Sequence, residues 1–402
     1  MDERQSKSTK LRILMIAPQP WFQPRGTPFS VLHRIKALSL LGHEIDLVTY
    51  PIGQDVPIDH LTIHRARRLP LVRRVKIGPS LPKIFLDWVL YQKAVELLKA
   101  NRYDYLHTHE EAAFFGVPLA QKYGLPHLYD MHSSLPQQLQ NFRFSNSRLL
   151  TGAFERLERN TIEKSAGVIT ICPELQNYVE KNFPRKTSIL IENVADNSVV
   201  FPTTASKEAA LRTQYGLHGK TVVLYYGTFE PYQGIDMLIE SAVYAAKDNS
   251  DIHFLMVGGS DEQTAAYRAK AQKLGVASRF TFTGFVQPEM IPSFVSLCHI
   301  LVSPRLQGSN SPLKIYSYLR SGKPIVATRH ITHTQILNDS VSMLAEPNPQ
   351  AFAEAILAVA KDAKRQKKMV AAAKQLAEKH YSYDDYLQKT RWIVEQVMRA
   401  KR

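Results

Sequence analysis

The sequence predicts an α/β protein of two doubly wound domains that face each other across a cleft. Short apolar runs rich in β-branched residues alternate with longer segments of helical period, which is typical of a parallel sheet covered by helices on both faces. The alternation occurs in two series, and a stretch rich in polar residues at 197–220 separates them. A chain of 402 residues is long enough for two such domains, each with its own core.

Six apolar runs make up the first series, and each predicts a buried strand. Helical period follows the first run from Pro28 to Leu41 and returns around residues 83–99. Parallel strands joined in this way require right-handed crossovers. The strands are expected at residues 12–17, 44–50, 103–109, 126–132, 167–172 and 187–193.

The second series contains six more runs of the same kind. We place the first domain at residues 1–200 and the second at 201–381, and we expect the helix at 382–402 to pack back on the first domain. The strands of the second domain are expected at residues 221–227, 252–259, 279–285, 299–304, 324–328 and 341–346.

The charge, the cysteines and the apolar content of the sequence indicate which partners and which cellular compartment to expect. With 51 Lys and Arg against 36 Asp and Glu, the net charge of +15 favours anionic partners. Nucleic acid is not expected, because no recognisable DNA- or RNA-binding motif accompanies that charge. Cys172 and Cys298 lie in apolar runs and predict buried thiols of a reducing compartment. The polar N-terminus and the lack of a long apolar run predict a cytoplasmic protein, at most peripheral on the inner face of the cell membrane.

Ligand-binding residues of open parallel sheets lie just after the strands. After the first strand, Gly26 permits a tight turn, Thr27 is expected to cap a helix and Pro28 to be its first residue. Backbone N–H groups at such a helix start can hold an anion or a sugar hydroxyl. An ordinary capped turn would have the same residues, so both interpretations stay open.

Histidines follow two other strands of the first domain. His107 and His109 alternate and therefore point to one face, but no Cys or acidic cluster completes a metal site, so we interpret them as structural. Glu110 and Glu111 are expected at a solvated helix start. His132 ends the next strand, where an imidazole could bind a sugar hydroxyl or merely belong to a capping loop.

Three segments of the second domain could bind a ligand. Gly227 is followed by a turn with Pro231 and Gly234, and the run from Gly284 through Phe285 to Val286 could border a flat ring; both segments could also be plain connections. In the third segment, Ser309 to Ser311 offer helix caps, Pro312 is the expected first helical residue and Lys314 lies in the opening turn.

The charge of Lys314 is unfavourable at a helix start. A cation there opposes the helix dipole unless an anion is bound. A phosphate at this helix end would suit Lys314, the backbone N–H groups and Arg305. The alternative is an exposed lysine, tolerated at small cost.

With these segments taken together, the chain resembles the retaining GT-B glycosyltransferases of glycosyltransferase family 4. The resemblance runs from about Leu11 to the C-terminal helix, and the order of the matching segments supports it more than any one of them. The segments are LRILMIAP, LSLLGHEIDLVT, AGVITICPEL, IENVADNSVVF, YYGTFEPYQGIDMLIESA, TGFVQPEMIPSFVSLCHILVSPR and SGKPIVAT.

The resemblance implies a hexosyltransferase-type enzyme that moves a sugar from a nucleotide diphosphate sugar with retention, without an essential metal or other cofactor. It implies that the first domain binds the acceptor and the second the donor. By position, Gly26 would lie near the donor phosphate or acceptor, His132 would be the active-site histidine, and Gly284, Phe285 and Val286 would border the nucleobase.

The sequence also departs from the family pattern. Thr228 and Gln233 stand where family members usually carry an Arg and a Lys for the diphosphate, and Gln307 and Ser317 stand in the region of two glutamates. Either other groups bind the diphosphate, or the chain is a degenerate transferase that serves as a binding or scaffold protein. The predicted donor site comprises Gly227, Thr228, Gln233, Phe285, Val286, Arg305, Gln307, Ser311, Pro312, Leu313, Lys314 and Ser317.

A basic segment suggests a membrane surface as a further partner. Residues 64–83 carry seven cations and no carboxylate, interspersed with apolar residues such as Leu69, Val72 and Val75. This combination suits anionic lipid and would bring a lipid-linked acceptor or another cell-envelope glycan precursor to the enzyme. A solvated basic loop is the alternative.

Overall fold

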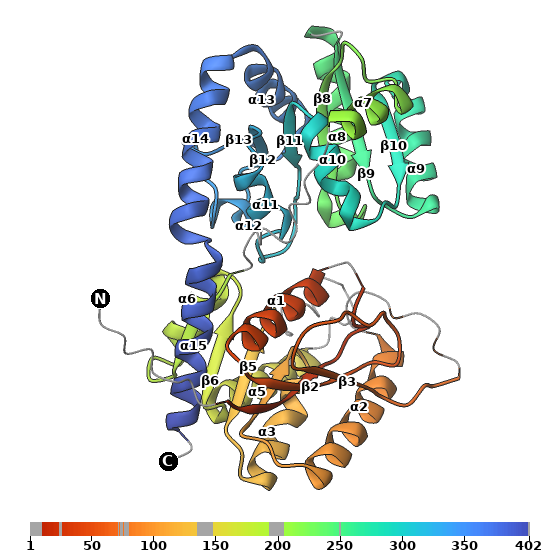
Figure 1. Ribbon diagram of the computed structural model, residues 1–402. Coiled ribbons are helices and arrows are strands. Elements are labelled where there is room, and N and C mark those ends of the chain that lie inside the picture. Colours follow the sequence, from red (N-terminus) through yellow and green to blue (C-terminus); the bar gives the residue numbers. More distant parts are fainter. Residues whose placement is uncertain are drawn as a thin grey trace. The chain divides into compact units, whose positions relative to one another are not determined.

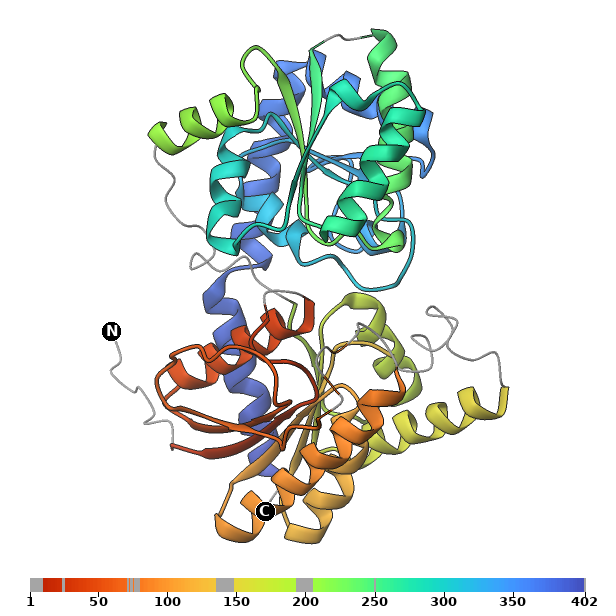
Figure 2. The same ribbon diagram turned by 90° about the vertical axis from the view of Figure 1, so that its right-hand side faces the viewer.

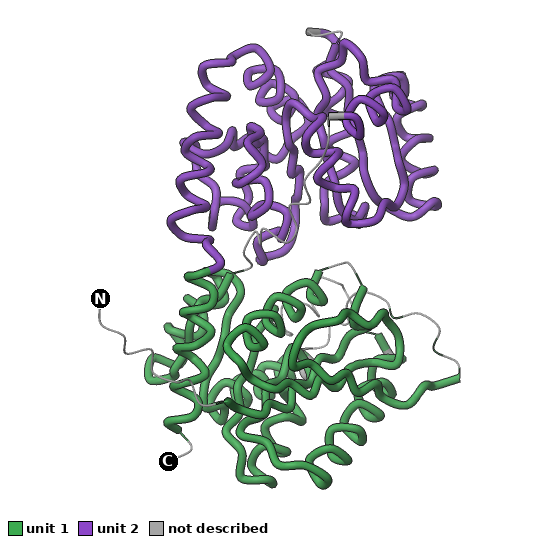
Figure 3. The backbone as a smooth tube through the Cα atoms, viewed as in Figure 1, with its two compact units in different colours: residues 1–193, 384–402 green, residues 194–383 purple. Residues whose placement is uncertain are grey.

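The computed structural model describes residues 10–23, 26–70, 72, 75, 80–134, 148–192, 205–248 and 251–400. The chain divides into two compact units (Figure 3). Unit 1 is Met1–Asn193 with Asp384–Arg402, and unit 2 is Val194–Tyr383. Both are doubly wound α/β folds, as the alternating sequence pattern predicts.

Unit 1 contains a parallel sheet of seven strands in the order β3-β2-β1-β4-β5-β6-β7. The strand order reverses between β1 and β4, which marks the carboxyl ends of these strands as the place for a ligand. Strand β3 was not predicted, because its partly buried residues form no apolar run. The strands are β1 (Arg12–Ala17), β2 (Glu44–Thr49), β3 (Leu61–Arg65), β4 (Tyr105–His109), β5 (His127–Met131), β6 (Gly167–Thr170) and β7 (Ser188–Leu190).

Helices cover both faces of this sheet. In Figure 1, α1 (Gly26–Leu40) lies on one face, and α2 (Leu81–Ala100) and α3 (Ala112–Tyr123) lie on the other. The C-terminal helix α15 (Tyr383–Arg399) packs on unit 1, where Val397 lies so close to Gly167 that a Cβ there would be 2.9 Å from Val397 Cγ2. The unit is completed by α5 (Arg148–Lys164) and α6 (Pro173–Asn182).

Unit 2 contains a parallel sheet of six strands in the order β10-β9-β8-β11-β12-β13. Figure 2 shows helices on both sides of this sheet. Its strand order reverses between β8 and β11. All six predicted strands are present, with ends that differ by one or two residues. They are β8 (Thr221–Tyr226), β9 (Ile252–Val257), β10 (Phe280–Gly284), β11 (Ile300–Ser303), β12 (Ile325–Thr328) and β13 (Met343–Ala345).

Two apolar cores lie on opposite faces of the sheet of unit 2. One is formed with α8 (Ile235–Asp248), α9 (Asp261–Lys273) and α13 (Pro349–Lys361). The other is formed with α7 (Ala205–Gln214), α10 (Ile291–Leu297), α11 (Lys314–Arg320) and α14 (Ala363–His380). The remaining helix is α12 (Ile331–Thr334), and short 3₁₀ turns occur at Pro231–Gln233, Ala277–Arg279 and Pro288–Met290.

Two smaller findings concern the cysteines and the helices. Cys172 and Cys298 are both buried and form no disulfide, as predicted. Within the described ranges, none of the helices combines the length and the apolar character that crossing a bilayer requires.

A glycine fixes the loop after β8 against the end of β11. Gly234 has φ of +74°, and a Cβ on it would lie 1.9 Å from the carbonyl oxygen of Pro304. Only a residue without a side chain permits this close approach. The approach brings the loop after β8 against the loop after β11, at the reversal of the strand order.

We predict that Gly234→Ala destabilises the protein more than Gly275→Ala does. Gly275 has nearly the same φ of +72° but open space around it, so its replacement costs only backbone strain, about 1 kcal/mol. The clash with Pro304 should add roughly 1–3 kcal/mol. Urea unfolding of both variants measures the difference, and equal losses would show that the close approach is unimportant.

Candidate functional site

A buried ion pair lies at the centre of the candidate site of unit 1. The Asp130 carboxylate at the end of β5 is fully buried, and Nε of Arg34 in α1 donates to it at 2.9 Å. The Arg34 guanidinium also donates to Thr390 and lies 5.0 Å from the ring centre of Tyr386, both in α15. The pair therefore connects α1, β5 and α15. Neither charge was identified from the sequence, although a lone Asp in the apolar strand HLYDM was a signal.

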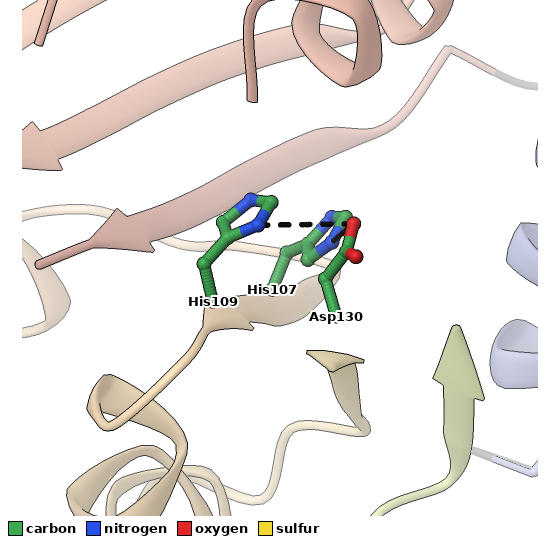
Figure 4. A group of neighbouring side chains, drawn as sticks. All are labelled: His107, His109 and Asp130. Atoms are coloured by element: carbon green, nitrogen blue, oxygen red, sulfur yellow. Dashed lines mark ion pairs between the residues drawn. The ribbon is translucent and has the colours of Figure 1, made fainter. Parts of the chain in front are cut away.

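Three histidines surround the Asp130 carboxylate. His107 Nε2 lies 3.4 Å from Oδ2, His109 Nδ1 3.7 Å from Oδ2 and His132 Nε2 3.3 Å from Oδ1. Figure 4 shows His107 and His109 side by side on β4, with Asp130 next to them. Their rings stack with centres 4.8 Å apart, which confirms that the alternating histidines share one face. His109 and His132 also share a hydrogen bond of 2.9 Å.

Burial decides the charge of these groups. It lowers the pKa of His132 to about 4, although the carboxylate of Asp130 acts in the opposite direction. Burial likewise lowers the pKa of His107 and His109. Burial alone would raise the pKa of Asp130, but Arg34 and the histidines hold it well below its usual range. At neutral pH the site therefore contains one ion pair and uncharged imidazoles, which can donate or accept hydrogen bonds.

Asp130 changes the assessment of the two histidines as metal ligands. The sequence indicated no Cys or acidic cluster that could complete a metal site, but β4 and β5 pair so that one carboxylate, Asp130, lies opposite His109. Ligand atoms of His107, His109 and Asp130 lie within 4.8 Å of one another. The guanidinium of Arg34 next to Asp130 would repel a divalent cation. That the protein needs no metal stays a prediction.

The start of α1 and the end of β4 form a second polar group. Helix α1 begins at Gly26, so Thr27 is not its cap and Pro28 is not its first residue. Instead, Thr27 Oγ1 donates to Glu110 Oε1 at 3.1 Å. Glu111 pairs with Lys83 of α2 at 3.2 Å, so the expectation of two solvated glutamates was wrong. Burial, reinforced by the charge of Glu111, raises the pKa of Glu110 to about 7.

Two desolvated cations mark the candidate site of unit 2. Lys314 Nζ donates to the Tyr226 carbonyl at 3.4 Å and lies 3.8 Å from the ring centre of Tyr225. It would be 3.6 Å from a Cβ on Gly227. The Arg305 guanidinium lies over the ring of Tyr232, 5.1 Å from its centre. Neither cation forms an ion pair with a residue in the part of the chain that the structure describes.

The pKa values of both cations reflect this environment. Burial lowers the pKa of Arg305. Burial lowers the pKa of Lys314 well below its usual range, and the nearby charge of Arg305 lowers it further. Because β8 and β11 pair directly, the residues after these strands converge at the reversal of the strand order. Lys314 lies beside Gly227 there, and Arg305 is close enough for its charge to act on Lys314.

The reason given for the position of Lys314 needs correction. Helix α11 begins at Lys314 and follows Leu313 without a side-chain cap, so Ser309 to Ser311 do not cap it and Pro312 is not its first residue. Ser311 and Pro312 are buried before the helix. With only seven residues in α11, the tyrosines and Gly227 explain the position of Lys314 better than a helix dipole does.

The other predicted donor residues are distributed around the same edge of the sheet. Ser317 hydrogen-bonds through its side chain to Tyr226, and the Gln307 carbonyl accepts from Arg305 Nε. The Thr228 carbonyl accepts from Tyr225, and Gln233 ends the 3₁₀ turn after β8. Phe285 follows β10 and is 63% exposed, while Val286 is partly buried. The ring of Phe285 is thus free to contact a flat ligand.

Comparison with known families accounts for nearly the whole chain. Residues 24–199 match the family described as Glycosyltransferase Family 4, and residues 207–376 match Glycosyl transferases group 1. The first match falls in unit 1 and the second in unit 2, each on a Rossmann-like sheet. The chain is a GT-B glycosyltransferase.

Relatives of this glycosyltransferase act on different substrates. It is 23% identical over 357 residues to an alpha-D-kanosaminyltransferase of Streptomyces kanamyceticus, a match that covers 82% of this chain and 88% of the relative. It is 21% identical over 375 residues to a phosphatidyl-myo-inositol mannosyltransferase of Mycobacterium leprae, with 90% and 91% covered. Such distant identity does not transfer a substrate.

A solved structure shows the same fold with a donor. The Anabaena protein HepE in complex with UDP-glucose superposes with a TM-score of 0.75 at 17% identity, over 96% of this chain and 99% of HepE. At this identity the likeness establishes the GT-B fold, and the sites of the glycosyltransferase rest on its own residues.

We predict that Asp130→Asn destabilises this glycosyltransferase by about 3–5 kcal/mol, because it leaves the Arg34 charge buried without a partner. The double variant Arg34→Met/Asp130→Asn should be more stable than Asp130→Asn alone, since it buries no charge. Urea unfolding of Asp130→Asn, Arg34→Met, the double variant and the wild type tests this. A double variant that loses the sum of both single losses would contradict it.

Proposed function

We propose that this glycosyltransferase moves a hexose from a nucleoside diphosphate sugar to an acceptor with retention, in the manner of family 4 and without a metal ion. The observation that carries the proposal is the pair of partly buried cations Lys314, which lies beside Gly227, and Arg305, whose charge acts on Lys314. A buried cation without an anion costs free energy, which an anionic ligand offsets. A diphosphate is the anion that such a donor supplies.

The same two cations suit the chemical step. As the bond from the sugar to the diphosphate breaks, negative charge grows on the leaving oxygen. Fixed cations aimed at that oxygen stabilise the transition state more than the ground state. The leaving phosphate can then take the proton of the acceptor hydroxyl, so the net change is one glycosidic bond broken and one formed on the same face of the sugar.

Unit 1 supplies the acceptor side in this proposal. His132 is neutral and oriented by Asp130, so it can hydrogen-bond a sugar hydroxyl without adding charge. Gly26 begins α1 beside the contact of Thr27 with Glu110. Relatives named for kanosaminyl and phosphatidylinositol mannosyl transfer are compatible with either a free or a lipid-linked acceptor. We propose a lipid-linked or cell-envelope glycan precursor.

A degenerate binding protein is the second candidate. It is favoured by Gln307 and Ser317, which carry no charge where the resemblance implies glutamates. Such a protein could bind a nucleotide sugar through Arg305 and Lys314 yet transfer nothing.

A panel of nucleotide sugars, beginning with UDP-glucose, separates the two candidates. Thermal stabilisation identifies the donor, because a ligand that binds only the folded state raises stability by mass action. Release of the nucleoside diphosphate shows turnover, and ¹H NMR of the product shows the configuration at the anomeric carbon. Stabilisation without release favours the binding protein, and an inverted anomer overturns retention.

We predict that Lys314→Met weakens binding of the stabilising donor by about 1.5–3 kcal/mol, the range for a hydrogen bond to a charged group. It should also stabilise the ligand-free protein by about 1 kcal/mol, because a desolvated charge is removed while the stem still packs on Tyr225. Calorimetry and urea unfolding measure the two effects. The exposed Lys247→Met is the matched control, and unchanged donor affinity in Lys314→Met would place the diphosphate elsewhere.

We predict that His132→Ala lowers kcat about tenfold to hundredfold and changes donor affinity little, because His132 lies in unit 1 and the donor is assigned to unit 2. Steady-state kinetics with the identified donor measure kcat, and calorimetry measures affinity. His218→Ala, at an exposed site in unit 2, is the control. An unchanged kcat would remove His132 from the catalytic residues.

A further inference from the structure

Helix α2 presents a row of large apolar side chains to solvent. Ile84 is 62% exposed, Phe85 64%, Trp88 59% and Tyr91 36%. Positions separated by three or four residues share one side of a helix, so these four side chains form a single face. We name it the α2 outer face. Single exposed apolar residues are common on proteins, whereas a contiguous group of this size marks an interaction surface.

The opposite side of α2 already packs in the core. Leu86, Val89 and Leu90 are buried against the sheet of unit 1. The helix is therefore apolar on two sides. On the α2 outer face, Tyr91 packs edge to face on Phe115, with ring centres 5.7 Å apart. Ile84, Phe85 and Trp88 are each more than half exposed, so their large side chains need another explanation.

The structure also revises the membrane prediction made from residues 64–83. Leu69, Val72 and Val75, expected to be available to lipid, pack against the core cluster of unit 1. Two of the seven cations are engaged internally, since Arg65 pairs with Asp55 and Lys83 with Glu111. Arg67 and Arg68 are exposed, whereas Arg73, Arg74 and Lys76 lie outside the described residues.

Charge indicates what covers the α2 outer face. Between Asp59 and Asp87 the sequence has no carboxylate, so the segment that leads into α2 carries only positive charge. The whole chain has a net charge of +15. Tryptophan and tyrosine favour the boundary between lipid headgroups and acyl chains, and arginines favour anionic headgroups. The exposed Arg67 and Arg68 lie in the segment that leads into α2.

We propose that the α2 outer face, with the exposed Arg67 and Arg68, is a docking surface for an anionic lipid bilayer. Phe85, Trp88 and Ile84 insert among the acyl chains, and the arginines contact the headgroups. Lys83, in the first turn of α2, pairs with Glu111, which follows Glu110 at the polar group near Gly26. Docking therefore brings a lipid-linked acceptor toward unit 1, a consequence that rests on the proposed function.

Co-sedimentation of the full chain with vesicles tests the docking itself. Vesicles of phosphatidylcholine alone are compared with vesicles that contain phosphatidylglycerol, at low and high salt. We expect binding to the anionic vesicles and weaker binding in high salt. The variant Ile84→Ser/Phe85→Ser/Trp88→Ser should lose more than tenfold in binding, and Arg67→Glu/Arg68→Glu should lose binding to a smaller extent.

The control variant replaces exposed apolar residues elsewhere, Leu274→Ser/Ile331→Ser, and should bind as the wild type does. Trp88 gives a second readout. In Trp392→Phe the remaining tryptophans are Trp88 and the buried Trp21, so brominated lipid should quench mainly Trp88. Urea unfolding shows whether each variant is folded.

Three outcomes would overturn the proposal: equal binding to neutral vesicles, a triple serine variant that binds as the wild type does, or no quenching of Trp88. Dissociation of a dimer by the triple variant, without vesicle binding in the wild type, would show that a second copy covers this face. Donor-dependent stabilisation is measured without vesicles, so a failure of docking and a failure of the proposed transfer are distinguishable.

Discussion

A carboxylate can be buried in a protein only where a cation or several hydrogen bonds compensate it, and this constraint organises unit 1. Asp130 is inaccessible to solvent, and Arg34 compensates its charge from a helix far away in the sequence. Because the same guanidinium contacts Thr390 and Tyr386, the C-terminal helix is part of this arrangement. The ion pair therefore links the ligand edge of the sheet to an element that comes last in the chain.

Unit 2 shows the opposite electrostatic situation. Its two cations at the reversal of the strand order are partly buried next to tyrosine rings and backbone carbonyls rather than carboxylates. Aromatic faces and carbonyl oxygens compensate a positive charge only in part. Unit 1 thus holds a compensated, neutral site that suits hydroxyl groups, whereas unit 2 holds an uncompensated positive site that suits a phosphate.

The departures from the family pattern can be understood in the same terms. A diphosphate site needs a positive charge close to the phosphates in the folded protein. Which segment of the sequence supplies that charge does not matter. Lys314 comes from the helix after β11, yet it reaches Tyr226 and Gly227 at the end of β8. Uncharged Thr228 and Gln233 in the loop after β8 are therefore compatible with donor binding, since the cation is supplied from a neighbouring element.

The sequence by itself determined the fold, because buried parallel strands leave long apolar runs and their alternation with helices is local. Six strands of unit 1 were predicted with ends within three residues of the observed ones, and only the edge strand β3, which lacks an apolar run, was not predicted. The sequence also singled out Lys314, though for a reason based on the helix dipole, and its role as a donor-binding residue stays a prediction. The tertiary structure decided which charges meet. Arg34 and Asp130 are 96 positions apart, Thr27 and Glu110 are 83 apart, and Lys314 and Tyr226 are 88 apart. A local sequence pattern cannot predict such pairs, because the two partners lie on different elements that meet only after the chain has crossed over through one or more helices.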